Sequence, residues 1–157
     1  MDPDGRICRC GNRGCLETVA SGPALLDLMR ASRGEAFSLD QVLDLAAAGD
    51  SGCRRAIADA GRNVGRALAS VVSILGPEIV VVGGELSRAG DDLLDPLAEA
   101  IHRFALPAAT QELAVVRGAL GDRANLLGAL ALVVTQSDHA VAARLVQAVD
   151  PAHPVEA

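Results

Sequence analysis

Residues 78–84 read Glu-Ile-Val-Val-Val-Gly-Gly, and this stretch decides the class of fold. Its β-branched centre has no polar alternation, which is typical of a parallel strand covered on both faces. Gly83 and Gly84 fall where such a strand ends, at the edge where open α/β sheets bind ligands. The two glycines leave room for a substrate beside the backbone, so they indicate nucleotide or sugar contact. A tight turn after a buried strand is the alternative.

Helical periodicity and glycine stops surround this strand on both sides. The predicted helices are residues 24–33, 39–48, 50–75, 91–104, 124–134 and 139–149. A second strand is predicted at residues 113–116, so strands and helices alternate in the middle of the chain, as in a right-handed parallel crossover. Within the long helix, Gly61, Gly65 and Ala69 recur every four residues and should let a neighbouring element come close. A polar break at residues 136–138 should separate the last two helices.

Composition narrows the class of protein. The chain has 157 residues, of which 50% are apolar and 22% charged, as in a single globular domain. No apolar run approaches the ~20 residues of a membrane span, and the acidic N-terminus lacks a secretion signal, so a cytoplasmic protein without membrane contact is expected. The net charge of −6 argues against nucleic-acid binding by this segment. Only Phe37 and Phe104 are aromatic, so a bound sugar would be held by hydrogen bonds.

Three of the four cysteines lie within eight residues. Cys8, Cys10 and Cys15 alternate with Gly11 and Gly14, which can turn the backbone through positive φ so that the thiolates converge. Cytosolic thiols stay reduced, and a disulfide between residues as close as Cys8 and Cys10 would be strained. A metal loop is therefore predicted, with structural zinc as the usual occupant; reduced cysteines without a metal are the alternative.

The fourth ligand of such a site is open. Structural zinc normally takes four ligands, and the loop supplies three. The other candidates in the chain are Asp2, Asp4, Cys53, His102, His139 and His153. None of the histidines has a spacing that marks a ligand, and Cys53 is expected to be a small buried apolar residue in a helix. The fourth group is therefore expected upstream of Met1.

Glu17 is the second candidate for a functional residue. It follows the last loop cysteine by two residues, so its carboxylate should be held beside a rigid, metal-braced turn. Such a carboxylate could accept hydrogen bonds from two neighbouring sugar hydroxyls. A glutamate placed at a helix N-terminus by the helix dipole is the alternative, and on local grounds it is the stronger one.

Residues 8–17 read Cys-Arg-Cys-Gly-Asn-Arg-Gly-Cys-Leu-Glu, and with the preceding Asp-Pro-Asp-Gly-Arg-Ile they resemble the signature of the ROK family. This family contains sugar kinases and sugar-responsive repressors built on an actin-like, ribonuclease H-like ATPase fold. The long helix, the Pro-Glu-Ile-Val-Val-Val-Gly-Gly-Glu strand and a terminal apolar helix follow in the same order. The resemblance covers essentially the whole chain, and it corresponds to the C-terminal half of a family member.

The resemblance implies a role for each candidate. Cys8, Cys10 and Cys15 would bind zinc, completed by a histidine just before this chain begins. Glu17 would hydrogen-bond the sugar hydroxyls. Gly83 and Gly84 would face the nucleotide in the kinases.

The expected architecture is a helix-rich α/β lobe with a short, mostly parallel sheet. Residues 1–157 are expected to form a single domain, with the zinc loop and sugar-contact segment at 1–17 and a C-terminal helix and tail at 135–157. The phosphate loop, the catalytic aspartate and the Glu-x-Gly-His element of the family would lie upstream. The chain is therefore expected to be a fragment, or a reading frame started late at Met1, and to be inactive alone.

Two parent functions follow from the resemblance. The first, slightly favoured, is a glucokinase-like hexose kinase, in which only the full-length protein would use ATP and Mg²⁺. The alternative is the sugar-sensing effector domain of a transcriptional repressor, whose DNA-binding module would lie upstream. A zinc-braced interaction domain is a third, weaker possibility. A hexose or N-acetylhexosamine ligand and a homo-oligomer are expected for both leading functions.

Overall fold

The computed structural model of the protein describes residues 2–149; for residue 122 and residues 137–149 it describes the backbone alone. The chain divides after Gly121 into two units. In the first unit the order of elements is α1 (Glu17–Ala20), α2 (Gly22–Arg33), α3 (Leu39–Ala47), α4 (Ser51–Leu75), β1 (Ile79–Val82), η1 (Glu85–Ala89), α5 (Asp91–Phe104), η2 (Pro107–Ala109) and β2 (Ala114–Arg117). Within the described residues, no helix is both long and apolar enough to cross a membrane.

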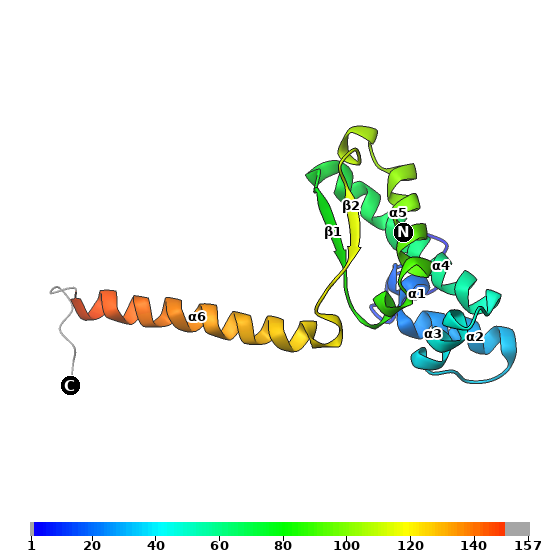
Figure 1. Ribbon diagram of the computed structural model, residues 1–157, viewed down its shortest axis with the longest axis horizontal. Helices are drawn as coiled ribbons and strands as arrows, with labels where there is room; N and C mark the ends of the chain where they lie inside the picture. Colours follow the sequence, from blue (N-terminus) through cyan, green and yellow to red (C-terminus); the bar gives the residue numbers. More distant parts are fainter. Residues whose placement is uncertain (1, 150–157) are drawn as a thin grey trace. The chain divides into compact units, whose positions relative to one another are not determined.

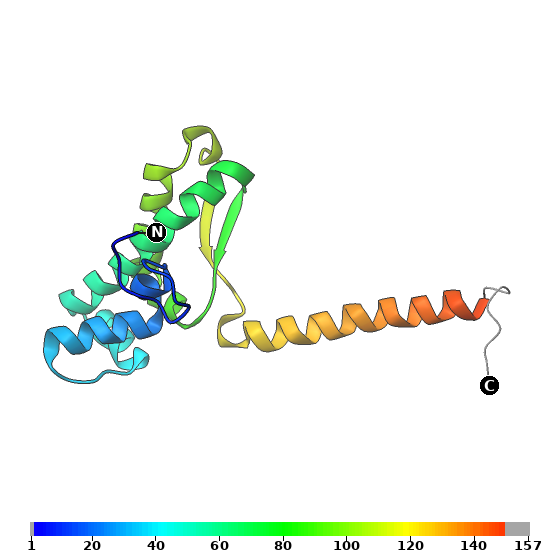
Figure 2. The same ribbon diagram turned by 180° about the vertical axis from the view of Figure 1, so that it is seen from behind.

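Strands β1 and β2 form a parallel pair (Figure 1), as the alternation of elements predicts. Val80 of β1 pairs with Val115 of β2. Helix α5 connects them. Their two arrowheads point toward the end of the unit that carries α1, in both views (Figures 1 and 2). The carboxyl edge of the pair therefore belongs to the same end of the unit as the segment that follows the cysteine loop.

The predicted helix boundaries in the first unit are confirmed closely because the caps are encoded locally. Ser38 Oγ accepts a hydrogen bond from Gln41 N, and Gln41 Oε1 accepts one from Ser38 N. Together these bonds form a capping box for α3. The carboxylate of Asp50 accepts the backbone N–H of Cys53 and caps α4. Gly76 ends α4 in the left-handed conformation that glycine adopts at little cost.

Helices α4 and α5 form the main packing interface of this unit, and glycines of α4 allow it. A Cβ at Gly61 would overlap the carbonyl of Leu93, and one at Gly65 would overlap that of Leu97. The predicted close approach along residues 61, 65 and 69 is therefore confirmed, with α5 as the neighbour. Small residues let the two backbones approach until the larger side chains beside them interlock.

Two apolar clusters hold this unit together. The first joins α2, α3 and the first half of α4, and its fully buried members include Val42, Cys53 and Ile57. Burial of Cys53 confirms that it is a core residue. The second cluster joins the last part of α4 to α5 around Val72 and Ile101, and the inner face of the strand pair packs on it.

The burial of β1 differs from the prediction. The sequence predicts a strand covered on both faces, but Ile79 and Val81 are 54% and 60% exposed, whereas Val80 and Val82 pack on the core. Alternate side chains of a strand point to opposite faces, so one layer of helices within this unit can cover only one of them. A run of β-branched residues does not by itself tell how many faces are covered.

In the second unit, η3 (Gly121–Arg123) leads into helix α6 (Ala124–Val149). The predicted break at residues 136–138 is wrong, because the helix continues through it. Gln, Ser and Asp lower helix propensity only modestly, and neither Gly nor Pro lies there to stop the helix. The expected tail after residue 149 lies outside the described residues.

Candidate metal centre and ligand-binding edge

The cysteine loop is a short hairpin closed by backbone hydrogen bonds. Ile7 and Arg13 form an antiparallel bridge, and Cys8 N donates to Asn12 O at 2.7 Å. Gly11 turns the chain with a φ of 89°, and its N–H donates to Cys8 O. Gly14 also has positive φ, and a Cβ there would overlap the backbone of Asp2. The loop thus needs its glycines, as the sequence predicts.

The hairpin brings the three thiols together. The sulfur atoms of Cys8, Cys10 and Cys15 all lie within 4.8 Å of one another, and those of Cys10 and Cys15 are 3.6 Å apart. Cys8 is buried, while Cys10 is exposed to solvent. Three convergent soft ligands could hold a metal ion. Among the described side chains, no other His, Cys, Asp or Glu joins this group.

The close thiols perturb one another. A backbone hydrogen bond from Asn12 is the main reason why the pKa of Cys10 lies below its ordinary value of 9.0, and hydrogen bonds from the other thiols add to this. The hydrogen bond with Cys10 is also the main cause that raises the pKa of Cys15 to about 11, followed by burial. Cys10 therefore loses its proton more easily than an ordinary thiol, and Cys15 less easily. The thiol of Cys15 keeps its proton because it donates it to the thiolate of Cys10.

The other candidates for a fourth ligand lie elsewhere or are not described. Cys53 is buried in the first core cluster, and His102 is exposed on α5. Asp2 and Asp4 precede the hairpin but do not belong to the cluster of thiols. The side chains of His139 and His153 lie outside the described part of the chain.

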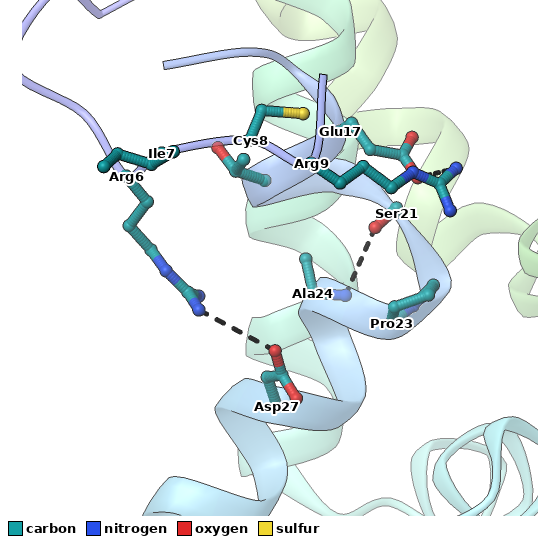
Figure 3. A pocket seen from close by; sticks show the side chains of 10 residues that line it. Arg6, Ile7, Cys8, Arg9, Glu17, Ser21, Pro23, Ala24 and Asp27 are labelled. Atoms are coloured by element: carbon teal, nitrogen blue, oxygen red, sulfur yellow. Dashed lines mark hydrogen bonds and ion pairs between the residues drawn. The ribbon is translucent and has the colours of Figure 1, made fainter. Parts of the chain in front are cut away.

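Glu17 begins α1 directly after the cysteine loop and lines a cavity of about 170 Å³. Its Oε1 lies 3.5 Å from Arg9 Nη2, and its side chain is 50% exposed. Across the cavity, Arg6 Nη2 lies 3.8 Å from Asp27 Oδ2 (Figure 3). The cavity wall thus carries two carboxylates and two guanidinium groups. They form two exposed ion pairs with long N–O distances, and a polar ligand could take the place of one partner in either pair.

The other charged residues of this wall were not predicted from the sequence. Arg6 and Arg9 belong to the hairpin, and Asp27 belongs to α2. Their signal was weak, because charged residues in a loop and on a helix surface are usually solvated. Only the fold of the hairpin onto α1 and α2 places them around one cavity.

Gly83 and Gly84 follow β1 at the carboxyl edge, as predicted. Both are exposed, and Gly84 has a φ of 83°. A Cβ at either position would meet no atom within 4 Å, so the backbone there is open to a ligand. Ser87 Oγ donates to Gly84 O at 2.7 Å and holds the turn into η1.

A third glycine at this edge was not predicted from the sequence. Gly118 follows β2, and its N–H donates to Val82 O at 2.9 Å. A Cβ there would lie 3.9 Å from Gly83 Cα, so the two strand ends form one edge that is rich in glycine. A glycine two residues after the second predicted strand was the available signal.

A pair of parallel strands connected through a helix and packed on helices defines the class as an α/β protein. The model of the ROK family matches residues 1–136, and the chain belongs to this family. The resemblance of residues 2–17 to the ROK signature is therefore confirmed.

Relatives of two kinds resemble the chain. The DNA-binding transcriptional repressor Mlc of Escherichia coli K12 is 31% identical over 94% of this chain and 38% of the repressor. The glucokinase of Thermotoga maritima is 33% identical over 85% of this chain and 46% of the kinase. The chain thus spans less than half the length of these curated relatives.

Solved structures support the same family. A ROK glucokinase from Streptomyces griseus, in complex with glucose and AMPPNP, matches with a TM-score of 0.72 and 28% identity over 84% of this chain and 48% of that protein. The helix-rich architecture with a short parallel sheet is therefore one that ROK proteins share.

Proposed function

We propose that this chain forms the sugar-contact lobe of a ROK sugar kinase of the glucokinase type, with a structural zinc in its cysteine hairpin. The observation that carries the proposal is the position of Glu17, which begins α1 directly after the hairpin and borders a polar cavity. Phosphoryl transfer depends on positioning both substrates, so it would belong to the whole protein and not to this lobe alone.

Zinc suits the three thiols. Thiolates that bind zinc tetrahedrally at about 2.3 Å lie about 3.8 Å from one another. The 3.6 Å between the sulfurs of Cys10 and Cys15 is close to that spacing, and Cys8 lies within 4.8 Å of both. A zinc ion would join the two arms of the hairpin and so brace the start of α1. Its role would be structural, because every ligand in the chain is a thiolate.

Glu17 would accept hydrogen bonds from two neighbouring hydroxyl groups of a hexose or N-acetylhexosamine. Hydrogen bonds from hydroxyl groups to a carboxylate are charge-assisted, and they are stronger than neutral ones. The cavity of about 170 Å³ is smaller than the 300–1,000 Å³ that is usual for ligand sites. Glu17 would therefore bind one edge of the sugar, and another part of the longer protein would close the site.

The glycines at the carboxyl edge of the strand pair favour the kinase over a protein that binds sugar alone. Gly83, Gly84 and Gly118 follow the two strands and carry no side chains, which suits the close approach of a nucleotide. In the kinase, ATP with Mg²⁺ would lie against this edge.

A repressor is the second candidate, and the match to Mlc over 94% of the chain favours it. In that protein the same Glu17 and zinc hairpin would sense the sugar, and the DNA-binding module would belong to another segment. The glycine edge would then be a turn without a nucleotide.

Sugar binding by the full-length protein tests the common part of both candidates. We expect Glu17→Gln to weaken glucose or N-acetylglucosamine binding at least tenfold in calorimetry, because the neutral amide loses the charge-assisted bonds. The matched control is Glu112→Gln, an exposed glutamate before β2, which should leave binding unchanged. Equal affinity of both variants and the wild type would disprove the role of Glu17.

Nucleotide binding separates the kinase from the repressor. Gly83→Val adds a side chain at an exposed position with no neighbour within 4 Å, so it should fold normally but obstruct a nucleotide. For a kinase, it should weaken AMPPNP binding at least tenfold and leave sugar binding intact. Ala47→Val, on the exposed side of α3, is the control. Wild-type protein that binds sugar but no nucleotide would favour the repressor.

A further inference from the structure

An exposed aromatic ring anchors two arginines on the surface formed by α4 and α5. Phe104 is 53% exposed at the end of α5. The Cζ of Arg66 lies 5.5 Å from the centre of its ring, and that of Arg103 lies 5.7 Å from it. Arg66 comes from α4, so the ring brings together cations from two helices. The close packing of these helices at Gly65 makes this meeting possible.

The hydrogen-bond donors of these two arginines are unused. Stacking on a ring occupies the face of a guanidinium and leaves the N–H groups at its edge available. Within the described part of the chain, neither Arg66 nor Arg103 forms an ion pair or donates a side-chain hydrogen bond. The neighbouring Arg62 differs, because its Nε and Nη2 both donate to Asp59 Oδ1, at 3.2 and 2.6 Å.

A small hollow lies between these side chains. It has a volume of about 90 Å³ and is lined by Arg62, Arg66, Pro96, Glu99, Ala100, Arg103 and Phe104. Water takes about 30 Å³ per molecule in the liquid, so the hollow can hold a group of a few heavy atoms. Three guanidinium groups face one such space, in a chain whose net charge is −6. Two unpaired cations held near one ring repel each other, and a bound anion would offset that repulsion.

We propose that Arg66 and Arg103, with Arg62 at the rim, form a binding site for a phosphate group. The planar edges of the guanidinium groups match the oxygens of a phosphate, which they can bind with paired hydrogen bonds. Phe104 holds both arginines in place, which reduces the entropy lost on binding. The site shares no residue with Glu17 or the cysteine hairpin, so it is independent of the proposed sugar site. Its ligand is inorganic phosphate or the phosphate of a small ester.

Glu99 limits the affinity of this site and gives a second way to test it. Its exposed carboxylate lines the same hollow and forms no ion pair among the described residues. An ionised Glu99 repels a phosphate that the arginines attract. Glu99→Gln removes this repulsion and keeps the size of the side chain, so it strengthens phosphate binding severalfold.

Calorimetric titration of the full chain with inorganic phosphate, at low ionic strength, tests the proposal. We expect saturable binding that Arg66→Gln with Arg103→Gln weakens at least tenfold and Glu99→Gln strengthens. Arg55→Gln, which removes an exposed arginine of α4 outside the hollow, should leave the affinity unchanged. All four substituted residues are exposed, and circular dichroism of each variant checks the fold.

Further titrations identify the ligand. Tighter binding of glucose 6-phosphate than of inorganic phosphate would assign the site to a phosphate ester, and the reverse would assign it to the free ion. Acetate binding equal to phosphate would overturn the assignment, because a carboxylate would then serve as well. No phosphate binding by the wild type, or equal binding by the double variant, would also overturn it.

Discussion

Arg33 and Asp50 join the end of one helix to the start of another. Nη2 of Arg33, in the last turn of α2, lies 2.5 Å from Oδ1 of Asp50. The same oxygen accepts the backbone N–H of Cys53 at 2.8 Å and thereby caps α4. Both side chains are about three-quarters shielded from solvent. One carboxylate oxygen therefore serves a cap and an interhelical ion pair at once.

This pair predicts a loss of stability in acid. The hydrogen bond from Arg33, followed by that from Cys53 N, holds the pKa of Asp50 well below its ordinary value of 3.8. A carboxyl whose pKa is depressed in the folded state stabilises the fold above the unfolded pKa. That contribution is lost as the pH falls below about 4. Asp50→Asn keeps an oxygen that can cap α4 but removes the charge that pairs with Arg33. We expect it to lower the melting temperature at pH 7 by roughly 2–4 °C and to flatten its dependence on pH between 5 and 3.

Asp95→Asn is the control for this experiment, because Asp95 is exposed and forms no ion pair among the described residues. It should change neither the melting temperature nor its dependence on pH by a comparable amount. A curve for Asp50→Asn parallel to that of the wild type would show that the ion pair adds nothing in this pH range.

The close packing of α4 and α5 at Gly65 predicts that any larger residue there reduces stability. A Cβ at this position would lie 2.7 Å from the Cβ of Ala100 and overlap the carbonyl of Leu97. Overpacking of this kind costs about 1–3 kcal/mol, which exceeds the gain of up to about 1 kcal/mol from replacing glycine in a helix. We expect Gly65→Ala to reduce the free energy of unfolding in urea. Ser70→Ala on the exposed side of the same helix should not reduce it.

The hairpin predicts close to one zinc per chain. Elemental analysis after purification without chelator should find zinc in the wild type and strongly reduced zinc in Cys10→Ser. Cys53→Ala should retain it, since Cys53 lies in the core and outside the hairpin. With three ligands from this chain, affinity should be lower than that of a complete four-ligand site. Zinc content unaffected by Cys10→Ser would show that the metal is held elsewhere.

Exposed apolar side chains at the end of α4 and on β1 predict self-association. Ile74 is 81% exposed, and Val81 on the outer face of β1 is 60% exposed. Exposed apolar side chains of this size favour association in water. We expect light scattering after size-exclusion chromatography to find oligomers of the chain, and fewer of them for Ile74→Ser combined with Val81→Thr. A monomeric wild type with cooperative melting would contradict this prediction.

Local signals in the sequence were enough for most of the elements. Caps such as Ser38 and Asp50, and the glycine stops at Gly34 and Gly76, act within a few residues, so they can be located without the fold. The spacing of cysteines and glycines likewise predicts the hairpin, because its turn involves only neighbours along the chain. The polar segment at 136–138 misled the prediction because polarity does not end a helix.

Long-range relationships needed the tertiary structure. Three findings depend on contacts between distant segments of the chain. Helix α5 is the neighbour of Gly61 and Gly65, and Gly118 lies beside Gly83. Only one face of β1 is covered within its unit. The same holds for Arg66 and Arg103, which are 37 positions apart in the numbering yet contact one ring. Backbone preferences and turn residues act over a few bonds, so the sequence by itself determined the elements and the thiol cluster. Side-chain packing decides which of these elements meet, so the cavity beside Glu17 and the arginine site came only from the fold.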